Sequence, residues 1–308
     1  MQYALLGDLR ISRLTLGTVQ FGMPYGVANV TGQPTLDTVT EILRCAFEAG
    51  VNCLDTAAVY GTSEEVIGEV LARLDAADRT VIVTKIPAMD DSVTAAAAAR
   101  FIEDSVRESL HRLRRETLDA CIFHREDNFA FADSLAKLRD NGLVRYIGAS
   151  TMSPARALEI VRSGLADAVQ VPTSCLDGRY IRAGVFAEAA ERGVALFVRS
   201  IYLQGLLLMP EQAIPADLVE VIPARRRLEA LARDAGISLA ELAYRYVASQ
   251  RGVTSIVVGI ETVKQARDNL SLAEKGPLEP AMIEAVEKSA AGVPERILMP
   301  NLWAKRAK

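Results

Sequence analysis

The chain has 308 residues, of which 50% are hydrophobic and 24% charged, with a formal net charge of −4 and a pI near 5.5. This composition is that of a globular protein, and one α/β barrel domain can account for residues 1–308. The chain has no basic excess for nucleic acid, no apolar run near the ~18 residues of a membrane span, and no secretion signal at its start. We therefore expect a cytoplasmic protein without nucleic-acid or membrane partners.

The first predicted element is a β-hairpin. Residues 3–15 contain two short apolar runs separated by a Gly-Asp pair, and we expect this hairpin to cap the floor of a barrel. A glycine-rich loop follows at 17–32. Apolar spacing then predicts a helix that starts near Thr35 and stops at Gly50.

From residue 51 onwards, short apolar runs alternate with helical segments. Continuously apolar strands are typical of a parallel sheet that is covered on both faces. Together with the helix at 35–50 and the strand before it, eight strand and helix units can be counted, which indicates a (β/α)8 TIM barrel with an N-terminal β-hairpin cap and a C-terminal tail. Strands are expected at 51–54, 81–84, 120–123, 146–149, 168–171, 195–198 and 255–258, and helices at 64–74, 94–113, 129–139, 154–162, 181–191, 223–235 and 239–248.

Three successive strands end in polar side chains. Asp55, Lys85 and His124 each follow an apolar run, and Tyr60 lies on the loop after Asp55. The carboxyl ends of the strands form the catalytic face of a parallel barrel, so we expect these side chains to meet there. A lone aspartate at a strand end is more often a turn or cap residue, and the inference therefore depends on the group.

The order Asp, Tyr, Lys, His resembles the catalytic tetrad of the aldo-keto reductases. The landmarks of that family keep their order from about residue 14 to 269, including segments similar to its first, second, fifth and sixth strands at 16–22 (LGTVQFG), 55–64 (DTAAVYGTSE), 142–150 (GLVRYIGAS) and 169–171 (VQV). The resemblance implies an NAD(P)-dependent oxidoreductase that interconverts an aldehyde or ketone and the alcohol.

The four residues suit this chemistry. Hydride transfer to a carbonyl leaves an alkoxide that needs a proton, and we expect Tyr60 to donate it. A lysine ammonium beside a phenol stabilises the phenolate, and a buried carboxylate keeps that lysine charged. These roles fall to Lys85 and Asp55, while His124 would orient the carbonyl oxygen.

The hydride must come from a nicotinamide cofactor, because no side chain supplies one. No two glycines stand two positions apart, so the Gly-x-Gly-x-x-Gly of a Rossmann site is absent. The resemblance instead places the nucleotide in the barrel mouth. The contacts it implies are Gly17, Thr18, Ser150, Thr151, Gln170, Arg199, Ser200, Leu203, Gln204, Gly205, Gly259, Glu261, Thr262, Gln265 and Asn269.

The choice between NADP(H) and NAD(H) stays open. Gly259 and Gln265 stand where many NADPH-dependent members carry lysine and arginine, so two cations for the 2′-phosphate are missing. Lys264 and Arg267 could substitute for them, whereas Glu261 could accept a hydrogen bond from a free ribose hydroxyl. Dual use of the two nucleotides is therefore plausible.

The substrate is a small-molecule carbonyl compound on this interpretation. Gln20 replaces an aromatic residue that is common after the first strand, Val59 and Tyr202 are expected at the mouth, and the pair at 173–174 (TS) replaces a commoner Tyr-Asn. Such a polar rim suits a sugar or another polyol carbonyl. Trp303 is expected to anchor the tail, although a tail that closes over the active site is the alternative.

Neither a metal nor a disulfide is expected. The four cysteines are dispersed without a Cys-x-x-Cys pair, and the two histidines form no His-x-x-x-His pattern. We interpret Cys45, Cys53, Cys121 and Cys175 as reduced packing residues.

Two other functions compete with the reductase. A cofactor-binding regulatory subunit would resemble the channel β-subunits, which share the fold and the tetrad. A barrel lyase or aldolase would use Lys85 as a Schiff-base nucleophile.

Overall fold

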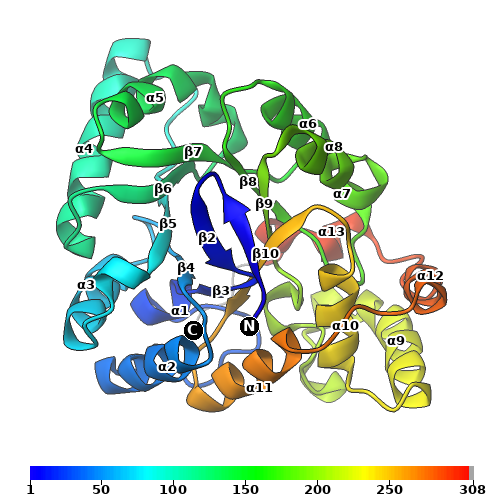
Figure 1. Cartoon of the computed structure of the whole chain (residues 1–308). Coiled ribbons are helices and arrows are strands. Elements are labelled where there is room, and N and C mark those ends of the chain that lie inside the picture. Colours follow the sequence, from blue (N-terminus) through cyan, green and yellow to red (C-terminus); the bar gives the residue numbers. More distant parts are fainter. Residues whose placement is uncertain (305–308) are drawn as a thin grey trace.

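The computed structural model describes residues 1–304, and its central feature is a closed barrel of eight parallel strands. The strands follow one another around the barrel in chain order, and the last pairs with the first (Figure 1). This confirms the predicted (β/α)8 barrel. The strands are β3 (Leu14–Gly17), β4 (Cys53–Asp55), β5 (Val81–Ile86), β6 (Leu118–Phe123), β7 (Val144–Ser150), β8 (Ala168–Pro172), β9 (Ala195–Arg199) and β10 (Val253–Gly259).

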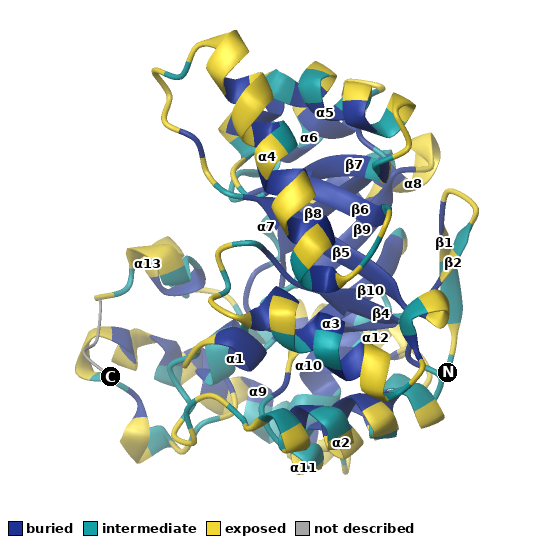
Figure 2. Ribbon diagram, turned by 90° about the vertical axis from the view of Figure 1, so that its left-hand side faces the viewer, coloured by how far each residue is buried: buried dark blue, intermediate teal, exposed yellow. Residues whose placement is uncertain are grey.

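Helices surround the barrel and bury one face each, so that exposed residues gather on the outer side (Figure 2). None of the helices within residues 1–304 has the length and apolar character that crossing a membrane requires. The helices are α1 (Val19–Gly22), α2 (Leu36–Glu48), α3 (Ser63–Arg73), α4 (Ala95–Leu113), α5 (Ala132–Asp140), α6 (Pro154–Arg162), α7 (Arg179–Arg182), α8 (Val185–Arg192), α9 (Ile222–Asp234), α10 (Leu239–Ala248), α11 (Val263–Ala273), α12 (Pro280–Ser289) and α13 (Glu295–Leu298).

Helix α2 shows why the sequence pattern predicts these elements. The Thr35 side chain accepts a hydrogen bond from the Thr38 amide and thereby caps the first turn. The buried side chains recur at helical spacing and face the barrel. Gly50, with φ of 87°, then adopts the left-handed conformation that ends the helix. The buried positions of α2 are Val39, Ile42, Leu43 and Ala46.

Several boundaries differ from the sequence predictions. The segment predicted as one helix at 181–191 is divided at Gly184, whose φ of 83° breaks the helix into α7 and α8. The helix predicted at 129–139 begins only at Ala132, after a 3-10 turn. The 3-10 segments are η1 (Ala77–Arg79), η2 (Glu126–Phe131), η3 (Leu203–Gly205), η4 (Glu211–Ala213), η5 (Ala216–Val221) and η6 (Pro300–Leu302).

The N-terminal hairpin plugs one end of the barrel. Strand β1 (Tyr3–Leu6) pairs antiparallel with β2 (Leu9–Ser12), so the hairpin is shorter than the predicted 3–15 and residues 14 and 15 belong to β3. Leu6 and Ile11 are fully buried against a cluster that includes the first residues of several barrel strands. Figure 2 shows this hairpin at the end of the molecule opposite α1 and α13.

Candidate active site

A buried ion pair lies at the carboxyl ends of β4 and β5. The Lys85 Nζ donates a hydrogen bond of 2.8 Å to Asp55 Oδ1 and one of 2.7 Å to the Thr56 carbonyl oxygen. The Gln170 amide donates to the same Asp55 oxygen at 2.7 Å. The Lys85 side chain is 0% exposed and that of Asp55 is 6% exposed. The structure therefore contains the Asp55–Lys85 ion pair that the sequence predicts.

The charge of Lys85 follows from its surroundings. Burial alone would lower the pKa of the Lys85 amine, but the Asp55 carboxylate and Tyr60 outweigh it, and the net direction is upward. Lys85 is therefore an ammonium group at neutral pH.

Tyr60 and His124 complete the cluster. The two rings pack edge to face, with centroids 5.6 Å apart and an interplanar angle of 82°, and Lys85 Nζ lies 5.1 Å from the Tyr60 centroid. No residue within 1–304 hydrogen-bonds the Tyr60 hydroxyl, which leaves that group available to a ligand. Burial, followed by the charges of Lys85 and Arg199, lowers the pKa of His124 to about 3. His124 is therefore a neutral imidazole over the ordinary pH range.

The loop that carries Tyr60 is fixed by close backbone packing. A Cβ atom added to Gly22 of α1 would lie 1.8 Å from the Tyr60 carbonyl oxygen, and one added to Gly61 would lie 2.3 Å from the Gly22 oxygen. Gly61 also has a φ of 56°, which favours glycine. The Thr62 amide donates to the Gly22 oxygen at 3.3 Å. Two glycines therefore let α1 and the Tyr60 loop touch directly.

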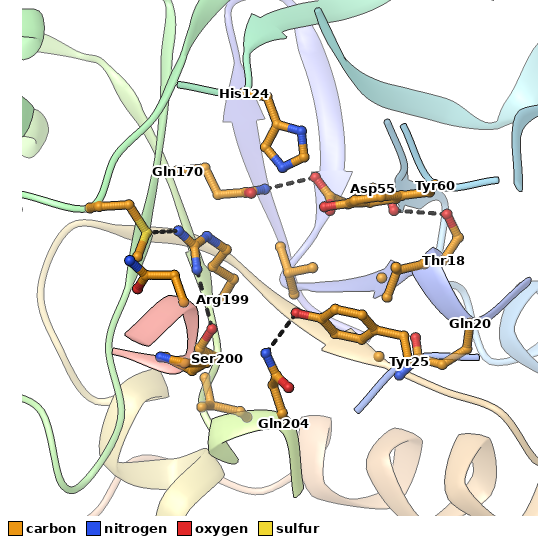
Figure 3. A pocket seen from close by; sticks show the side chains of 18 of the residues that line it. Thr18, Gln20, Tyr25, Asp55, Tyr60, His124, Gln170, Arg199, Ser200 and Gln204 are labelled. Atoms are coloured by element: carbon orange, nitrogen blue, oxygen red, sulfur yellow. Dashed lines mark hydrogen bonds between the residues drawn. The ribbon is translucent and has the colours of Figure 1, made fainter. Parts of the chain in front are cut away.

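A cavity of about 800 Å³ opens above this cluster, within the ~300–1,000 Å³ range usual for ligand pockets. Figure 3 shows several of its side chains, with His124, Asp55 and Tyr60 on one side and Ser200 and Gln204 on the other. The sequence-predicted residues that line it are Gly17, Thr18, Gln20, Asp55, Tyr60, His124, Gln170, Arg199, Ser200, Tyr202, Gln204 and Gly259.

Other predicted contacts lie outside the lining. Lys85 is buried beneath it, Ser150 and Thr151 are buried within the barrel wall, and Val59 is exposed. The sequence predicts the residues at 173–174 at the polar rim of the mouth, but both are only 1% exposed and lie outside the cavity lining. Leu203, Gly205, Glu261, Thr262, Gln265 and Asn269 also lie outside the lining.

The segment at 261–269 forms its own hydrogen-bond network. The Glu261 amide donates to Gln265 Oε1 at 2.9 Å, and Gln265 Nε2 donates to the Glu261 carboxylate at 3.1 Å. Thr262 caps α11 through the Gln265 amide. The Tyr202 hydroxyl donates to Asn269 Oδ1 at 3.0 Å, which connects this segment to the cavity wall.

The loop after β9 contains a run of left-handed backbone conformations. The φ angles of Ser200, Leu203 and Gln204 are 64°, 47° and 55°, and such strain in non-glycine residues is concentrated at functional sites. Gln204 Nε2 donates to the Tyr25 hydroxyl at 2.9 Å. This bond joins the loop after β9 to the glycine-rich loop after β3 at the cavity.

Sequence reasoning missed part of the lining. Tyr25 and Met152 have no motif that marks them, and they reach the cavity through the paths of their loops. Arg199 donates to the Thr151 oxygen at 3.2 Å and to Met152 Sδ at 3.0 Å. The other lining residues without a prediction are Val19, Arg125, Glu126, Asp127, Ile201, Val257, Pro300 and Asn301.

Trp303 anchors the tail, as the sequence predicts, and the residues before it reach the cavity. The Trp303 indole donates to the carbonyl oxygens of Arg296 and Ile297, at 3.2 Å each, and so anchors the tail on α13. Pro300 and Asn301, just before it, line the cavity. The part of the tail at 305–308 lies outside the described residues.

Among the described residues, the cysteines and the acidic side chains form no disulfide and no metal site. All four cysteines are free, and Cys53, Cys121 and Cys175 are buried. Burial raises the pKa of Cys53 and of Cys175 to about 12, so these thiols stay protonated. Within residues 1–304, no group of three or more His, Cys, Asp or Glu side chains is placed to hold a metal.

Comparison with known proteins agrees with the barrel fold. The sequence profile of the Aldo/keto reductase family matches residues 13–291. The NADH-specific methylglyoxal reductase of Escherichia coli is 25% identical over 86% of this chain and 90% of its own length. A probable voltage-gated potassium channel subunit beta of Arabidopsis thaliana is also 25% identical, over 96% of this chain and 98% of its own length.

A solved structure shares the fold. The holo form of an aldo-keto reductase from Bacillus halodurans superposes with a TM-score of 0.78, covering 97% of this chain and 100% of that chain at 23% identity. The family profile spans the barrel strands that carry Asp55, Lys85 and His124. The chain therefore belongs to the aldo/keto reductase family and is an NAD(P)H-dependent oxidoreductase.

Proposed function

We propose that the chain reduces a small polar aldehyde or ketone of the sugar or polyol type, with Tyr60 as the proton donor. The observation that carries this proposal is the arrangement around the Tyr60 ring. A buried ammonium, Lys85, lies 5.1 Å from the ring centroid and is fixed by Asp55, while His124 packs against the ring edge.

The residues divide the work as follows. A substrate carbonyl oxygen between Tyr60 and His124 accepts the phenolic proton as negative charge develops on it. The Lys85 ammonium stabilises the phenolate that remains, and Asp55 holds this ammonium in place. Because His124 is neutral, it donates one N–H to the oxygen without adding a charge.

The cavity fits a nicotinamide nucleotide, which supplies the hydride when bound. Gly17 and Gly259 are register partners on β3 and β10 and both line the cavity, so neither position adds a side chain of its own to the wall. The Gln204 and Ser200 side chains also line the cavity, across from Asp55 and Tyr60 in Figure 3, and offer hydrogen-bonding groups. These residues, together with Thr18 and Gln170, would hold the nucleotide.

The nucleotide preference rests on the segment at 261–269. The resemblance places the adenosine end here, where Gln265 and Glu261 bond to each other. Lys264 pairs with Asp268 at 2.6 Å, which reduces the charge it offers to a 2′-phosphate. We propose that both NAD(H) and NADP(H) bind, without the large NADPH preference that a lysine and an arginine would give.

The test of the proposed function is Tyr60→Phe. The variant keeps the ring but lacks the proton donor, so turnover should fall on the order of 10²-fold or more while nucleotide affinity stays within twofold. Steady-state rates with a panel of small aldehydes and sugars measure the first quantity, and fluorescence titration with NADH and NADPH measures the second. Full turnover by the variant would contradict the proposal.

A nucleotide-binding regulatory subunit is the second candidate, favoured by the similarity to the plant channel subunit. It predicts tight nucleotide binding without turnover of any carbonyl compound by the wild-type protein. A Schiff-base lyase is less well supported, because Lys85 is charged and hydrogen-bonded to Asp55 and Thr56. Borohydride trapping of a substrate adduct on Lys85 would reveal that chemistry.

A further inference from the structure

Gln20 is a buried amide that lines the cavity without a partner. It lies on α1 and is 9% exposed, and its Oε1 has no hydrogen-bond partner among residues 1–304. Buried polar atoms in folded proteins are almost always hydrogen-bonded. The residue lines the cavity although this oxygen is itself shielded, so the amide must turn for a bound molecule to supply the missing donor.

The position of this amide depends on Gly259. A Cβ atom added to Gly259 would lie 2.7 Å from Gln20 Nε2 and 3.0 Å from Gln20 Oε1. The φ of Gly259 is outside the left-handed region, so its backbone conformation does not require glycine. A side chain at position 259 would instead displace the Gln20 amide, the end of a flexible side chain, from its place.

Gln20 is also fixed relative to the reacting residues. Two positions further along the chain, the Gly22 backbone packs against the Tyr60 carbonyl and accepts a hydrogen bond from the Thr62 amide. The neighbouring Phe21 is fully buried. The Gln20 amide therefore belongs to a short helix that is attached directly to the loop of Tyr60.

The hydrogen-bonding chemistry of the amide indicates which kind of group it binds. An unpartnered carbonyl oxygen needs a donor, which neither a carboxylate nor a fully ionised phosphate can provide. A hydroxyl group both donates and accepts, so it can bond either end of an amide. We propose that Gln20, seated against Gly259, hydrogen-bonds a hydroxyl group of the molecule bound in the cavity.

Two molecules could present this hydroxyl group, and both are ligands of the proposed reaction. The inference therefore rests on the proposed function. One is a hydroxylated carbonyl substrate, and the other is the ribose of the nucleotide. In both cases Gln20 determines specificity and takes no part in proton transfer.

The first experiment uses Gln20→Met, which keeps the side-chain volume and removes the hydrogen bond. NADH affinity is measured by fluorescence titration, and kcat/KM is measured with glyceraldehyde and with propanal, which lacks the hydroxyl groups. A ribose contact predicts about tenfold weaker NADH binding. A substrate contact predicts unchanged NADH binding and about a tenfold loss of kcat/KM for glyceraldehyde, with propanal within twofold.

The second experiment tests whether Gly259 determines the position of the Gln20 amide. Gly259→Ala should reproduce the change in NADH affinity or kcat/KM that Gln20→Met causes. In the Gln20→Met background, the same substitution should change these quantities by less than a further twofold. Gly276→Ala is the matched control, because a Cβ atom there meets nothing within 4 Å and the φ of Gly276 is not left-handed. Thermal unfolding of each variant separates a binding defect from a folding defect.

Each outcome decides the inference. A Gln20→Met variant in which NADH affinity and both kcat/KM values stay within twofold would overturn it. If the wild-type protein reduces neither aldehyde, these substrates give the proposed function no support, and the NADH titration alone then decides the role of Gln20. In that case an unchanged NADH affinity in Gln20→Met would overturn the inference.

Discussion

The two ends of the barrel use the same eight strands in different ways. At the floor, Leu6 and Ile11 fill the interior, and the buried Asp119 carboxylate accepts bonds from the Ile82 amide and from Arg115. At the mouth, Gln20 Oε1 has no partner within residues 1–304, and the backbone of Ser200 is left-handed. One end satisfies its own groups, whereas the other leaves groups for a ligand, as expected when active sites lie at the carboxyl ends of barrel strands.

The largest effect is expected at the mouth, from Asp55→Asn. This change leaves the Lys85 ammonium buried without a counter-charge, which costs about 3–5 kcal/mol when one partner of a buried pair is removed. Turnover should fall on the order of 10²-fold, because the ammonium that supports Tyr60 is no longer held. Urea unfolding and steady-state rates measure the two effects. A variant with wild-type stability would show that the pair contributes little to the fold.

The floor should respond in stability alone. Leu6→Ala removes a fully buried side chain and should lower the free energy of unfolding by about 2–5 kcal/mol, while kcat of the folded protein remains unchanged. Leu5→Ala is the matched control, because Leu5 is 65% exposed on the same strand and should change stability by less than about 0.5 kcal/mol. A large change of kcat in Leu6→Ala would mean that the two ends are coupled.

A pH titration sharpens the contrast further. The pKa of His124 is lowered from 6.5 to about 3 by burial and by the neighbouring cations, so the unfolded state binds the proton more readily than the folded state. The contribution of neutral His124 to the free energy of unfolding is fully present above pH 6.5 and is lost as the pH falls towards 3. Between pH 7 and 5 the wild type should lose about 2 kcal/mol more than His124→Gln in urea unfolding. Parallel curves for the two proteins would contradict the assigned shift.

The smallest effect is expected at the nucleotide end. Gln265→Arg adds a cation where the resemblance places the 2′-phosphate, and it should tighten NADPH binding about tenfold, or about 1.4 kcal/mol, without changing NADH affinity. Gln212→Arg, on an exposed position of η4, adds the same charge elsewhere and is the control. In the native protein we expect less than about 100-fold discrimination between the nucleotides. A thousandfold preference for NADPH in calorimetry would contradict this expectation.

The sequence by itself determined the elements and their order. Apolar strands, capped helices and the polar residues at strand ends are local patterns, and parallel connection of the strands necessarily brings Asp55, Lys85 and His124 to one end. The predicted pairing of Lys85 with Asp55 needed only this topology and elementary electrostatics.

Only the tertiary structure decided the rest of the mouth. Tyr25 and Pro300 reach the cavity because loops far apart in sequence fold over the same strand ends, and no local pattern encodes such a meeting. The contact between Gln20 of α1 and Gly259 of β10 forms because the first and last barrel strands, β3 and β10, become neighbours when the barrel closes. Composition and periodicity describe one segment at a time, whereas a ligand site is formed between segments.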